Sequence, residues 1–442
     1  MKDERLPSLE ALRRVCGQPY AFWLDSALAD ERLGRTSFWG AEPFLILRSW
    51  GRSIELWTRG GTHRFSGNPL ETLRQLLRQS RRDGASGGAV GYLAYELKRF
   101  GEDLPQRAVD DLGLPESYLC FYETIARFDP RPLAVGASAM PRHSPLDGAL
   151  APPSNFTLEG YKRAVQRVRD YIFAGDIYQV NLSQRFQLPL VGSPFDGYLR
   201  LRSDNPAPFA AYLNLPEVQV LSASPERFLR FDPISRRVQT RPIKGTRPRG
   251  RTAEEDAALA KELLASEKDR AENVMIVDLE RNDLGRVAEI GSVRVTELFC
   301  QETLPTVFHL TSTVEAVLRE DLDVVDLLLA TFPGGSITGA PKIRAMEIID
   351  ELEPTARSVY TGSVGYVGFD GSLDLNIAIR TILVKDGVAY FQAGGGIVAD
   401  SEPEMEYQET LHKARALCRA LTDHGLPETG PGSPHAVDVS QR

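Results

Sequence analysis

A proline-dense segment at residues 141–155 divides the sequence into two parts of different character. It holds four prolines in fifteen residues. Proline disfavours helix interiors and central strands because its ring fixes φ and removes the amide hydrogen. Short strand-like runs precede the segment, and long helical and extended patterns follow it. We therefore expect an N-terminal region at 1–140, a main region at 155–424, and a disordered tail at 425–442, where proline and glycine are again frequent.

The main region mixes helical and strand patterns. Apolar residues recur at helical spacing between 161 and 172, with Thr157 as the expected N-cap. The other patterns predict two strands at 218–243 with a break near Asp232-Pro233, helices at 253–284, and two strands at 373–392 around a hairpin turn at 385–387. Such a mixture is typical of an α+β or α/β layered architecture.

Charge and cysteine content argue against several classes of function. The 442-residue chain has 52 Lys and Arg against 60 Asp and Glu, a net charge of −8, whereas nucleic-acid binders usually carry a basic stripe. We find neither the apolar core of a signal peptide nor a stretch of about 18 apolar residues, so we expect no membrane span and a cytoplasmic location. The four cysteines are far apart and form no metal-ligand pair, which disfavours zinc.

The segment at 242–250, Pro-Ile-Lys-Gly-Thr-Arg-Pro-Arg-Gly, places Lys244 at the end of an expected strand. A lysine there can project into a cleft, and its amine becomes a nucleophile when burial lowers the pKa from about 10.4. A hairpin between this segment and Ser224-Pro225-Glu226 would bring a nucleophile and an acid, Glu226, into one site. The residues alone leave open an exposed lysine in a basic loop, or a weak phosphate or nucleic-acid patch made by the arginines.

A second candidate is Glu272 on the expected helix. It shares one face with Met275, Ile276 and Leu279 through i, i+3, i+4, i+7 spacing. A carboxylate on an apolar face needs a partner, because an unpaired buried charge is costly. An arginine or a metal ion could be that partner.

A third segment begins with Gly394, Gly395 and Gly396. Ser401 and Glu404 match a capping box, so we expect a helix to begin there, and glycines ahead of it leave amides open to an anion. One face of this helix would carry Glu406, Glu409, Thr410 and Lys413. A surface Glu–Lys ladder is the alternative for that face.

Glutamates from two separate helices suit Mg²⁺, which takes oxygen ligands completed by water and substrate. A further glycine-rich run at 332–342 also opens an expected helix. It lacks the GxxxxGK[ST] order of a phosphate loop, so the sequence gives no support for ATP binding.

Six segments together identify a family: GDIYQVNLS at 175–183, SPERF at 224–228, PIKGTRPRG at 242–250, DLERNDLGRV at 278–287, PGGSITGAPKIRAMEII at 333–349 and GGGIVADSEPEMEYQET at 394–410. On these segments the chain resembles the chorismate-utilising enzymes, and among them the aminodeoxychorismate synthase component I branch. Residues 23–26, Trp-Leu-Asp-Ser, are a looser match to the tryptophan-pocket motif of the family's variable N-terminal region. The resemblance implies an α+β fold, an α/β sandwich of two large antiparallel β-sheets flanked by helices as in anthranilate synthase component I.

The resemblance also implies roles for individual residues. Lys244 matches the lysine that attacks C2 of chorismate, where anthranilate synthases have alanine, and Glu226 matches the general acid for the C4 hydroxyl. Gln179 stands where isochorismate and salicylate synthases carry a water-activating lysine, and a glutamine fits ammonia better. His309, for which a core histidine is the alternative, and Thr246 match further active-site positions. The other implied positions are the substrate-binding residues Arg380, Tyr366, Gly394, Gly395, Gly396 and Lys413, and the Mg²⁺ ligands Glu272, Glu409 and Glu406, the last of which could act through water.

The implied reaction is amination of chorismate at C4 with ammonia, giving 4-amino-4-deoxychorismate for p-aminobenzoate and folate synthesis, with Mg²⁺ as cofactor. A separate glutamine amidotransferase subunit would supply the ammonia, since no cysteine here lies in a Gly-Cys-Gly segment. Neither a nucleic acid nor a membrane is expected as a partner. The alternatives are anthranilate synthase component I, which Lys244 disfavours, and a non-catalytic chorismate-binding protein, which Glu226, Glu272 and Glu409 disfavour.

Overall fold

The computed structural model describes residues 9–28, 33, 36–81, 86–128 and 152–421. Of the expected linker, only residues 152–155 lie within these ranges. The tail expected at 425–442 lies outside the described residues.

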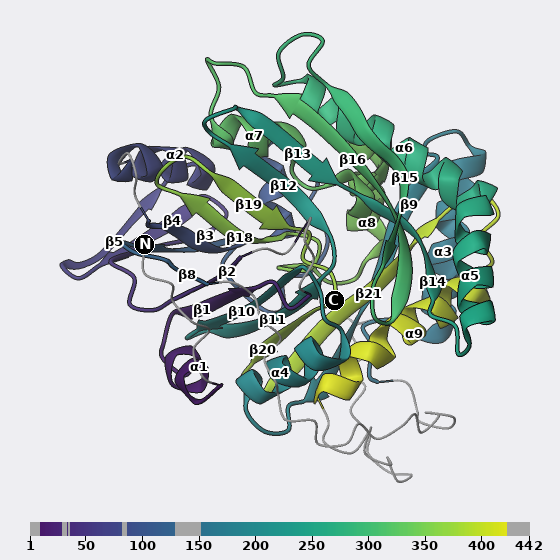
Figure 1. Ribbon diagram of the computed structural model, residues 1–442, viewed down its shortest axis with the longest axis horizontal. Helices are drawn as coiled ribbons and strands as arrows, with labels where there is room; N and C mark the ends of the chain where they lie inside the picture. The colour runs from purple at the N-terminus through teal and green to yellow at the C-terminus, as the bar shows by residue number, and fades with distance from the viewer. Residues whose placement is uncertain (1–8, 29–32, 34–35, 82–85, 129–151, 422–442) are drawn as a thin grey trace.

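Two large antiparallel sheets form the centre of the described chain (Figure 1). The nine-stranded sheet contains, in spatial order, β17 (Gly339–Ala340), β9 (Gln179–Pro189), β21 (Val388–Ile397), β20 (Thr381–Lys385), β11 (Val218–Ser224), β10 (Phe209–Leu215), β1 (Ala21–Asp25), β2 (Ser37–Gly40) and β8 (Ala126–Phe128). The twelve-stranded sheet contains β14 (Ile243–Pro248), β16 (Val307–Val317), β13 (Arg237–Arg241), β12 (Arg227–Asp232), β19 (Leu373–Asn376), β18 (Ser363–Gly368), β6 (Gly88–Leu93), β7 (Ser117–Tyr122), β3 (Leu45–Trp50), β4 (Ser53–Thr58) and β5 (Gly61–Ser66), and β15 (Arg294–Thr303) also pairs with β16. The expected α+β sandwich is confirmed.

Helices flank the two sheets. They are α1 (Leu9–Cys16), α2 (Pro69–Ser80), α3 (Leu158–Phe173), α4 (Pro194–Asp204), α5 (Ala253–Ala265), α6 (Glu267–Gly285), α7 (Val324–Thr331), α8 (Lys342–Leu352) and α9 (Pro403–Leu421), with 3₁₀ helices η1 (Tyr95–Phe100) and η2 (Gly335–Ile337). In Figure 1, α3, α5 and α9 lie together on the right, beside β14 and β21. None of the helices within the described ranges is long and apolar enough to cross a membrane.

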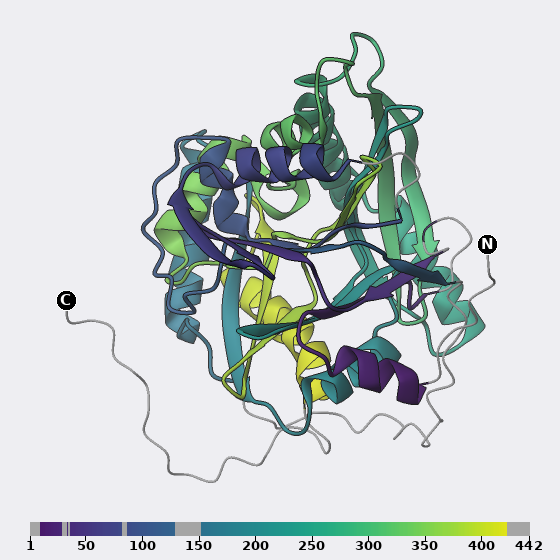
Figure 2. The ribbon, with the colours of Figure 1, turned by 90° about the vertical axis from the view of Figure 1, so that its left-hand side faces the viewer.

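The N-terminal region contributes strands to both sheets. Purple and blue strands from the first part of the chain lie beside teal and green strands from the second part (Figures 1 and 2). β1 pairs with β10 in one sheet, and β6 pairs with β18 in the other. Apolar side chains from both parts share their cores, as Phe121 and Phe369 do with ring centroids 6.2 Å apart. The proline-dense segment therefore separates two stretches of sequence that fold against each other.

Several expected elements are confirmed. Thr157 caps α3 by accepting a hydrogen bond from the amide of Gly160 at 3.0 Å. The turn between β20 and β21 has Asp386 and Gly387 at positive φ, as a tight hairpin requires. The segment 253–284 forms α5 and α6.

The prediction of two strands over 218–243 is wrong in one respect. The chain crosses from the nine-stranded to the twelve-stranded sheet at Pro225-Glu226, between β11 and β12, and turns again before β13. Because β11 and most of β12 are buried, alternation of polar and apolar residues does not mark the crossing. The crossing places Glu226 where the two sheets meet.

Candidate active site

Strands of both sheets and two helices meet around Lys244. β14 and β16 belong to one sheet, β9 and β21 to the other, and α6 and α9 pack beside them. Charges from Glu226, from Glu272 on α6, and from Glu409 and Lys413 on α9 all act on the Lys244 amine. The acid candidate Glu226 and the metal-ligand candidates Glu272 and Glu409 thus lie near Lys244.

The loop at 332–341 joins Lys244 to Glu226. The Lys244 Nζ donates to the carbonyl oxygen of Ser336 at 2.9 Å, and the Ser336 side chain hydrogen-bonds with the Glu226 carboxyl. The backbone amide of Ile243 donates to Glu226 Oε1 at 3.3 Å. The expected hairpin between their segments is replaced by the β12–β13 hairpin followed by β14, but the acid and the amine still share one site.

Burial shifts both groups toward their uncharged forms. It raises the pKa of Glu226 to about 7, against the opposing effects of the Ser336 hydrogen bond and the Lys244 charge. Burial also lowers the pKa of the Lys244 amine, against the opposing charges of Glu272 and Glu226. A carboxyl that keeps its proton near neutrality can act as an acid, and an amine that loses its proton more easily can act as a nucleophile.

His309 on β16 is buried and connects Thr246 with Arg380. Its Nδ1 lies 2.8 Å from Thr246 Oγ1, and its Nε2 lies 3.5 Å from Arg380 Nη2. Since the guanidinium can only donate, Nε2 accepts, and Nδ1 carries the proton. Burial, followed by the Arg380 charge, lowers the pKa of His309 to about 3. The neutral imidazole therefore orients Arg380.

Arg380 is a cation without a carboxylate partner in the described residues. Its guanidinium forms no ion pair there, and burial alone lowers its pKa. Its backbone φ of 50° lies in the left-handed region, which is strained for a residue other than glycine. A buried charge without a counter-charge suits an anionic ligand, for example a carboxylate.

The glutamates expected to hold Mg²⁺ lie on α6 and α9. Glu272 forms neither a hydrogen bond nor an ion pair with any described residue, so the arginine alternative is not realised. The buried positions of α6 include Asn273, Ile276 and Glu280, and Glu272 is only half-buried. On α9, Glu409 Oε1 accepts from Lys413 Nζ at 2.7 Å.

The acidic cluster fits Mg²⁺ in its chemistry. Within the described ranges, no three His, Cys, Asp or Glu side chains converge closely enough to hold a metal on their own. Glu272 and Glu409 offer carboxylate oxygens, and Mg²⁺ is usually bound by one or two carboxylates plus water and substrate. Glu272 and Glu409 could provide those two carboxylates. Burial raises the pKa of Glu272. Burial also acts to raise the pKa of Glu409, but the charge and hydrogen bond of Lys413 outweigh it and lower that pKa.

Glu406 is held differently from the prediction. The expected capping box does not form, because the Ser401 hydroxyl donates to Glu406 Oε1 at 2.6 Å, and α9 begins at Pro403. The sequence signal for a helix start was correct, but the serine binds Glu406, two residues beyond the expected Glu404. The sequence singled out Ser401 only as a helix cap and not as a partner of Glu406.

The three glycines lie inside β21, not in a loop ahead of a helix. A side chain at 396 would overlap the Gln179 carboxamide, and a Cβ at 395 would lie 3.1 Å from Glu406 Oε2. The Gln179 amide is buried, and neither its nitrogen nor its oxygen has a hydrogen-bond partner among the described residues. The glycine run makes room for these polar groups, and Lys413 Nζ donates to the carbonyl of Gly394 at 2.8 Å.

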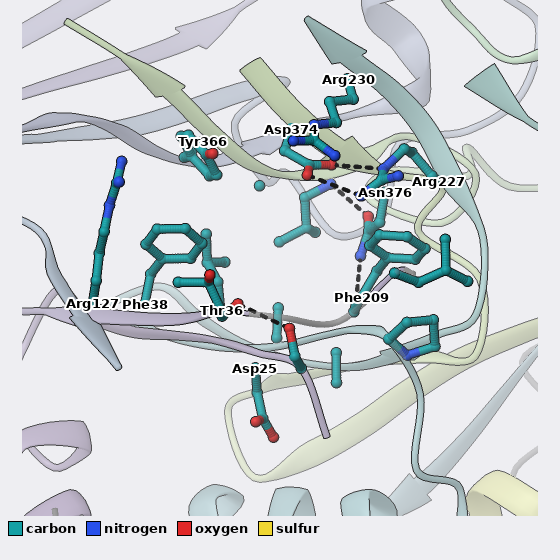
Figure 3. Close-up of a pocket in the computed structure, with 18 residues that line it drawn as sticks. Asp25, Thr36, Phe38, Arg127, Phe209, Arg227, Arg230, Tyr366, Asp374 and Asn376 are labelled. Carbon is teal, nitrogen blue, oxygen red and sulfur yellow. Dashed lines mark hydrogen bonds and ion pairs between the residues drawn. The ribbon is translucent and has the colours of Figure 1, made fainter. Parts of the chain in front are cut away.

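Tyr366 does not join this site. It lies on β18 and lines a separate cavity of about 350 Å³ between the sheets, where its ring packs against Phe38 with centroids 5.0 Å apart (Figure 3). Leu24, Asp25 and Ser26 of the Trp-Leu-Asp-Ser segment line the same cavity, and no other candidate catalytic or metal-binding residue does. The expectation that Tyr366 shares a substrate site with Arg380 is corrected, since the crossing of the chain between sheets separates the two.

The arginines around Lys244 bind carboxylates of the protein itself. Arg247 pairs with Glu262 and Asp269, at 2.7 and 3.0 Å. Arg249 pairs with Asp256 at 2.6 Å. These ion pairs explain the local basic sequence without a phosphate or nucleic-acid ligand.

Comparisons with known proteins agree with this geometry. The chorismate binding enzyme family matches residues 20–419. Aminodeoxychorismate synthase component 1 of Escherichia coli is 42% identical over 92% of this chain and 94% of its own, and anthranilate synthase component 1 of Cereibacter sphaeroides is 43% identical over 92% and 90%. The crystal structure of anthranilate synthase component I from Streptococcus pneumoniae superposes with a TM-score of 0.75 at 34% identity, covering 87% of this chain and 92% of that one. The chain belongs to the chorismate binding enzyme family, and it is an enzyme of the anthranilate and aminodeoxychorismate synthase component I type.

Proposed function

We propose that this chain is component I of an aminodeoxychorismate synthase, which aminates chorismate at C4 with ammonia. The observation that carries the proposal is the contact of Lys244 and Glu226 with the same residue, Ser336. An amine and a protonated carboxyl held together in this way can act at C2 and C4, which the conjugated ring diene connects. An anthranilate synthase needs no nucleophilic amine there.

The chemistry divides into two balanced steps. In the first, the neutral Lys244 amine forms a bond to C2, both ring double bonds shift by one position, and the C4–oxygen bond breaks as Glu226 donates its proton, releasing water. In the second, ammonia forms a bond to C4, both ring double bonds shift back, and the C2–Lys244 bond breaks as the neutral amine leaves. A proton from the added ammonia restores Glu226.

The other polar groups suit the substrate's two carboxylates. Arg380, oriented by His309, and Lys413 offer cationic donors. Mg²⁺ bound by Glu272 and Glu409 would supply further positive charge to a carboxylate and aid departure of the leaving oxygen. The unpartnered Gln179 amide, buried against Gly396, offers hydrogen bonds to an incoming ammonia.

A partner subunit that hydrolyses glutamine belongs to the same proposal. The relatives are named "component 1", which implies a second component in those enzymes. For this chain, we propose a glutamine amidotransferase that delivers ammonia to the site, because no Gly-Cys-Gly segment is present to release it from glutamine.

Product analysis tests the proposal. The purified chain is incubated with chorismate, Mg²⁺ and an ammonium salt, and the products are separated by chromatography and identified by mass. We expect 4-amino-4-deoxychorismate without release of pyruvate. Anthranilate with pyruvate would support the second candidate, anthranilate synthase component 1, the name of the 43% identical Cereibacter sphaeroides relative and of a 48% identical Thermus thermophilus relative. No amination at all would contradict both.

A further inference from the structure

A buried acidic group that the proposed reaction does not use lies beneath the loop that carries Ser336. Glu280 lies on α6 at 2% exposure, and its Oε1 accepts a hydrogen bond from the backbone amide of Gly335 at 2.9 Å. Its other oxygen, Oε2, has no hydrogen-bond partner among the described residues. A carboxyl in such a place costs free energy, because a buried polar oxygen without a partner is unfavourable.

The contact at Gly335 leaves no room for a side chain. A Cβ there would lie 2.7 Å from Leu279 Cδ2 and 3.0 Å from Glu280 Oε1. The backbone of the loop therefore lies directly on α6, and the glutamate fixes it at the residue before Ser336. Ser336 in turn contacts both Lys244, through its carbonyl, and Glu226, through its side chain.

A second buried pair anchors the base of the same loop. Lys342, the first residue of α8, pairs with Asp283 on α6 and donates to the carbonyl oxygens of Thr331 at 2.9 Å and Pro333 at 2.8 Å. The Lys342 pair thus holds the start of the loop, and Glu280 holds its middle. The charged groups that act on Glu280 are Asp283 on its own helix, Lys342 on α8 and Glu226 before β12.

We propose that Glu280 is a positioning residue for the proposed reaction: by holding the Gly335 amide, it fixes Ser336 between the Lys244 amine and the Glu226 carboxyl. Glu280 itself contacts neither of the two reacting groups. The inference rests on the proposed function for its kinetic consequences, but the placement of Lys244 that it describes can be measured without any turnover.

The kinetic test compares Glu280→Leu, which removes the acceptor, with Glu280→Gln, which keeps an oxygen for the Gly335 amide. We expect kcat of the leucine variant to fall by about tenfold or more, with KM for chorismate little changed, since a misplaced catalytic group costs rate more than binding. The glutamine variant should retain most of the parent kcat. Asp350→Leu is the matched control, because Asp350 is also buried and also accepts from backbone amides, those of Arg107 and Ala108.

The pH profile separates positioning from simple destabilisation. The Ser336 hydrogen bond lowers the pKa of Glu226, so its loss should raise that pKa and move the alkaline fall of kcat to higher pH in Glu280→Leu. Ser336→Ala should give a similar shift, and the double variant should lose less than the product of the two single losses. The Asp350→Leu profile should match the parent. Where Glu280→Leu does not fold, as judged by circular dichroism, Glu280→Ala is measured in the same way.

A labelling experiment stands independently of the reaction. Each folded variant is acetylated briefly with acetic anhydride, and the extent at Lys244 is read by peptide mapping. We expect Lys244 to react at least severalfold differently in Glu280→Leu than in the parent, in Glu280→Gln and in Asp350→Leu. If the parent makes no aminated product, the proposed function fails while this labelling still decides the inference. Parent-like labelling, or equal kinetic losses and unshifted profiles in Glu280→Leu and Asp350→Leu, would overturn it.

Discussion

Lys244 is the residue on which the choice between amination at C4 and at C2 depends. Lys244→Ala removes the amine but leaves Glu226, Arg380 and the glutamates in place. We expect formation of 4-amino-4-deoxychorismate to fall by about 10²-fold or more, because the covalent path is lost while acid catalysis and binding remain. Some product aminated at C2 should appear. Chromatography with mass detection measures both products.

The covalent bond itself can be located. Intact-protein mass spectrometry of the parent during turnover should show an adduct, and peptide mapping should place it on the Lys244 peptide. The Lys244→Ala variant, which serves as the control, should show none. A variant that makes the C4 product at the parent rate, together with a parent that never forms an adduct, would reduce Lys244 to an electrostatic role.

Glu226 predicts a pH dependence whose sign follows from its shifted pKa. Burial raises this pKa to about 7, so the carboxyl holds its proton below that pH and loses it as the pH rises. Because the proposed acid acts only when protonated, kcat should fall as the pH rises through about 7. Glu226→Gln should lower kcat by about 10²-fold or more and flatten this limb. A pH–rate profile at saturating chorismate and ammonium checks it, and an unchanged alkaline limb in Glu226→Gln would assign the limb to another group.

Among the elements, α6 and α9 supply the carboxylates assigned to Mg²⁺. Glu272→Gln on α6 and Glu409→Gln on α9 should each abolish Mg²⁺-dependent turnover without unfolding the protein, since each removes one of two charged ligands. Calorimetric titration with Mg²⁺ gives a readout separate from activity, and binding should weaken by at least tenfold, as loss of a charged ligand implies.

Glu404→Gln is the matched control for that pair. Glu404 lies on the same helix as Glu409, and it pairs on the surface with Lys162 at 3.3 Å. Exposed ion pairs contribute little to stability, so this variant should bind Mg²⁺ and turn over like the parent. Parent-like activity of both Glu272→Gln and Glu409→Gln at saturating Mg²⁺ would remove the metal assignment.

Elements were predictable from the sequence where a local signal defines them. Thr157 accepts a hydrogen bond at the start of α3, and the Asp386-Gly387 turn closes the β20–β21 hairpin, because caps and tight turns depend on neighbouring residues. The crossing at Pro225-Glu226 was not predictable, because both flanking strands are buried and periodicity carries no sheet assignment. The glycine run was taken for a helix-opening loop because strand glycines that make room for side chains from other elements leave no local trace.

Some residues of the candidate site were also predictable from the sequence, and others were not. Glu226 and Lys244 could be proposed together because each follows or begins a recognisable strand pattern, and the family segments assigned the glutamates. The roles of Ser336 and Ser401 were missed, since each acts through hydrogen bonds to residues far away in the sequence or around a helix start. Tyr366 was assigned by the resemblance, and the cavity that it lines is formed by residues of both sheets, which no local pattern in the sequence reveals.

At the scale of the whole molecule, the described chain assembles a site for chorismate, and the proposed function assigns glutamine hydrolysis to a separate subunit. Each of its four cysteines lies outside a Gly-Cys-Gly segment, and three of them are buried. Burial raises the pKa of the thiols of Cys16, Cys120 and Cys418 to about 12, which keeps them protonated and unreactive near neutral pH.

We therefore expect the purified chain to form aminated product from ammonium salts and hardly any from glutamine. The rate with ammonium should rise with pH, because the fraction of free ammonia grows, until Glu226 loses its proton. Parallel assays with the two nitrogen donors check this, with a glutamine amidotransferase added as the positive control for glutamine use. Efficient use of glutamine by the single chain would show that it carries its own amidotransferase activity and would contradict the division of labour proposed here.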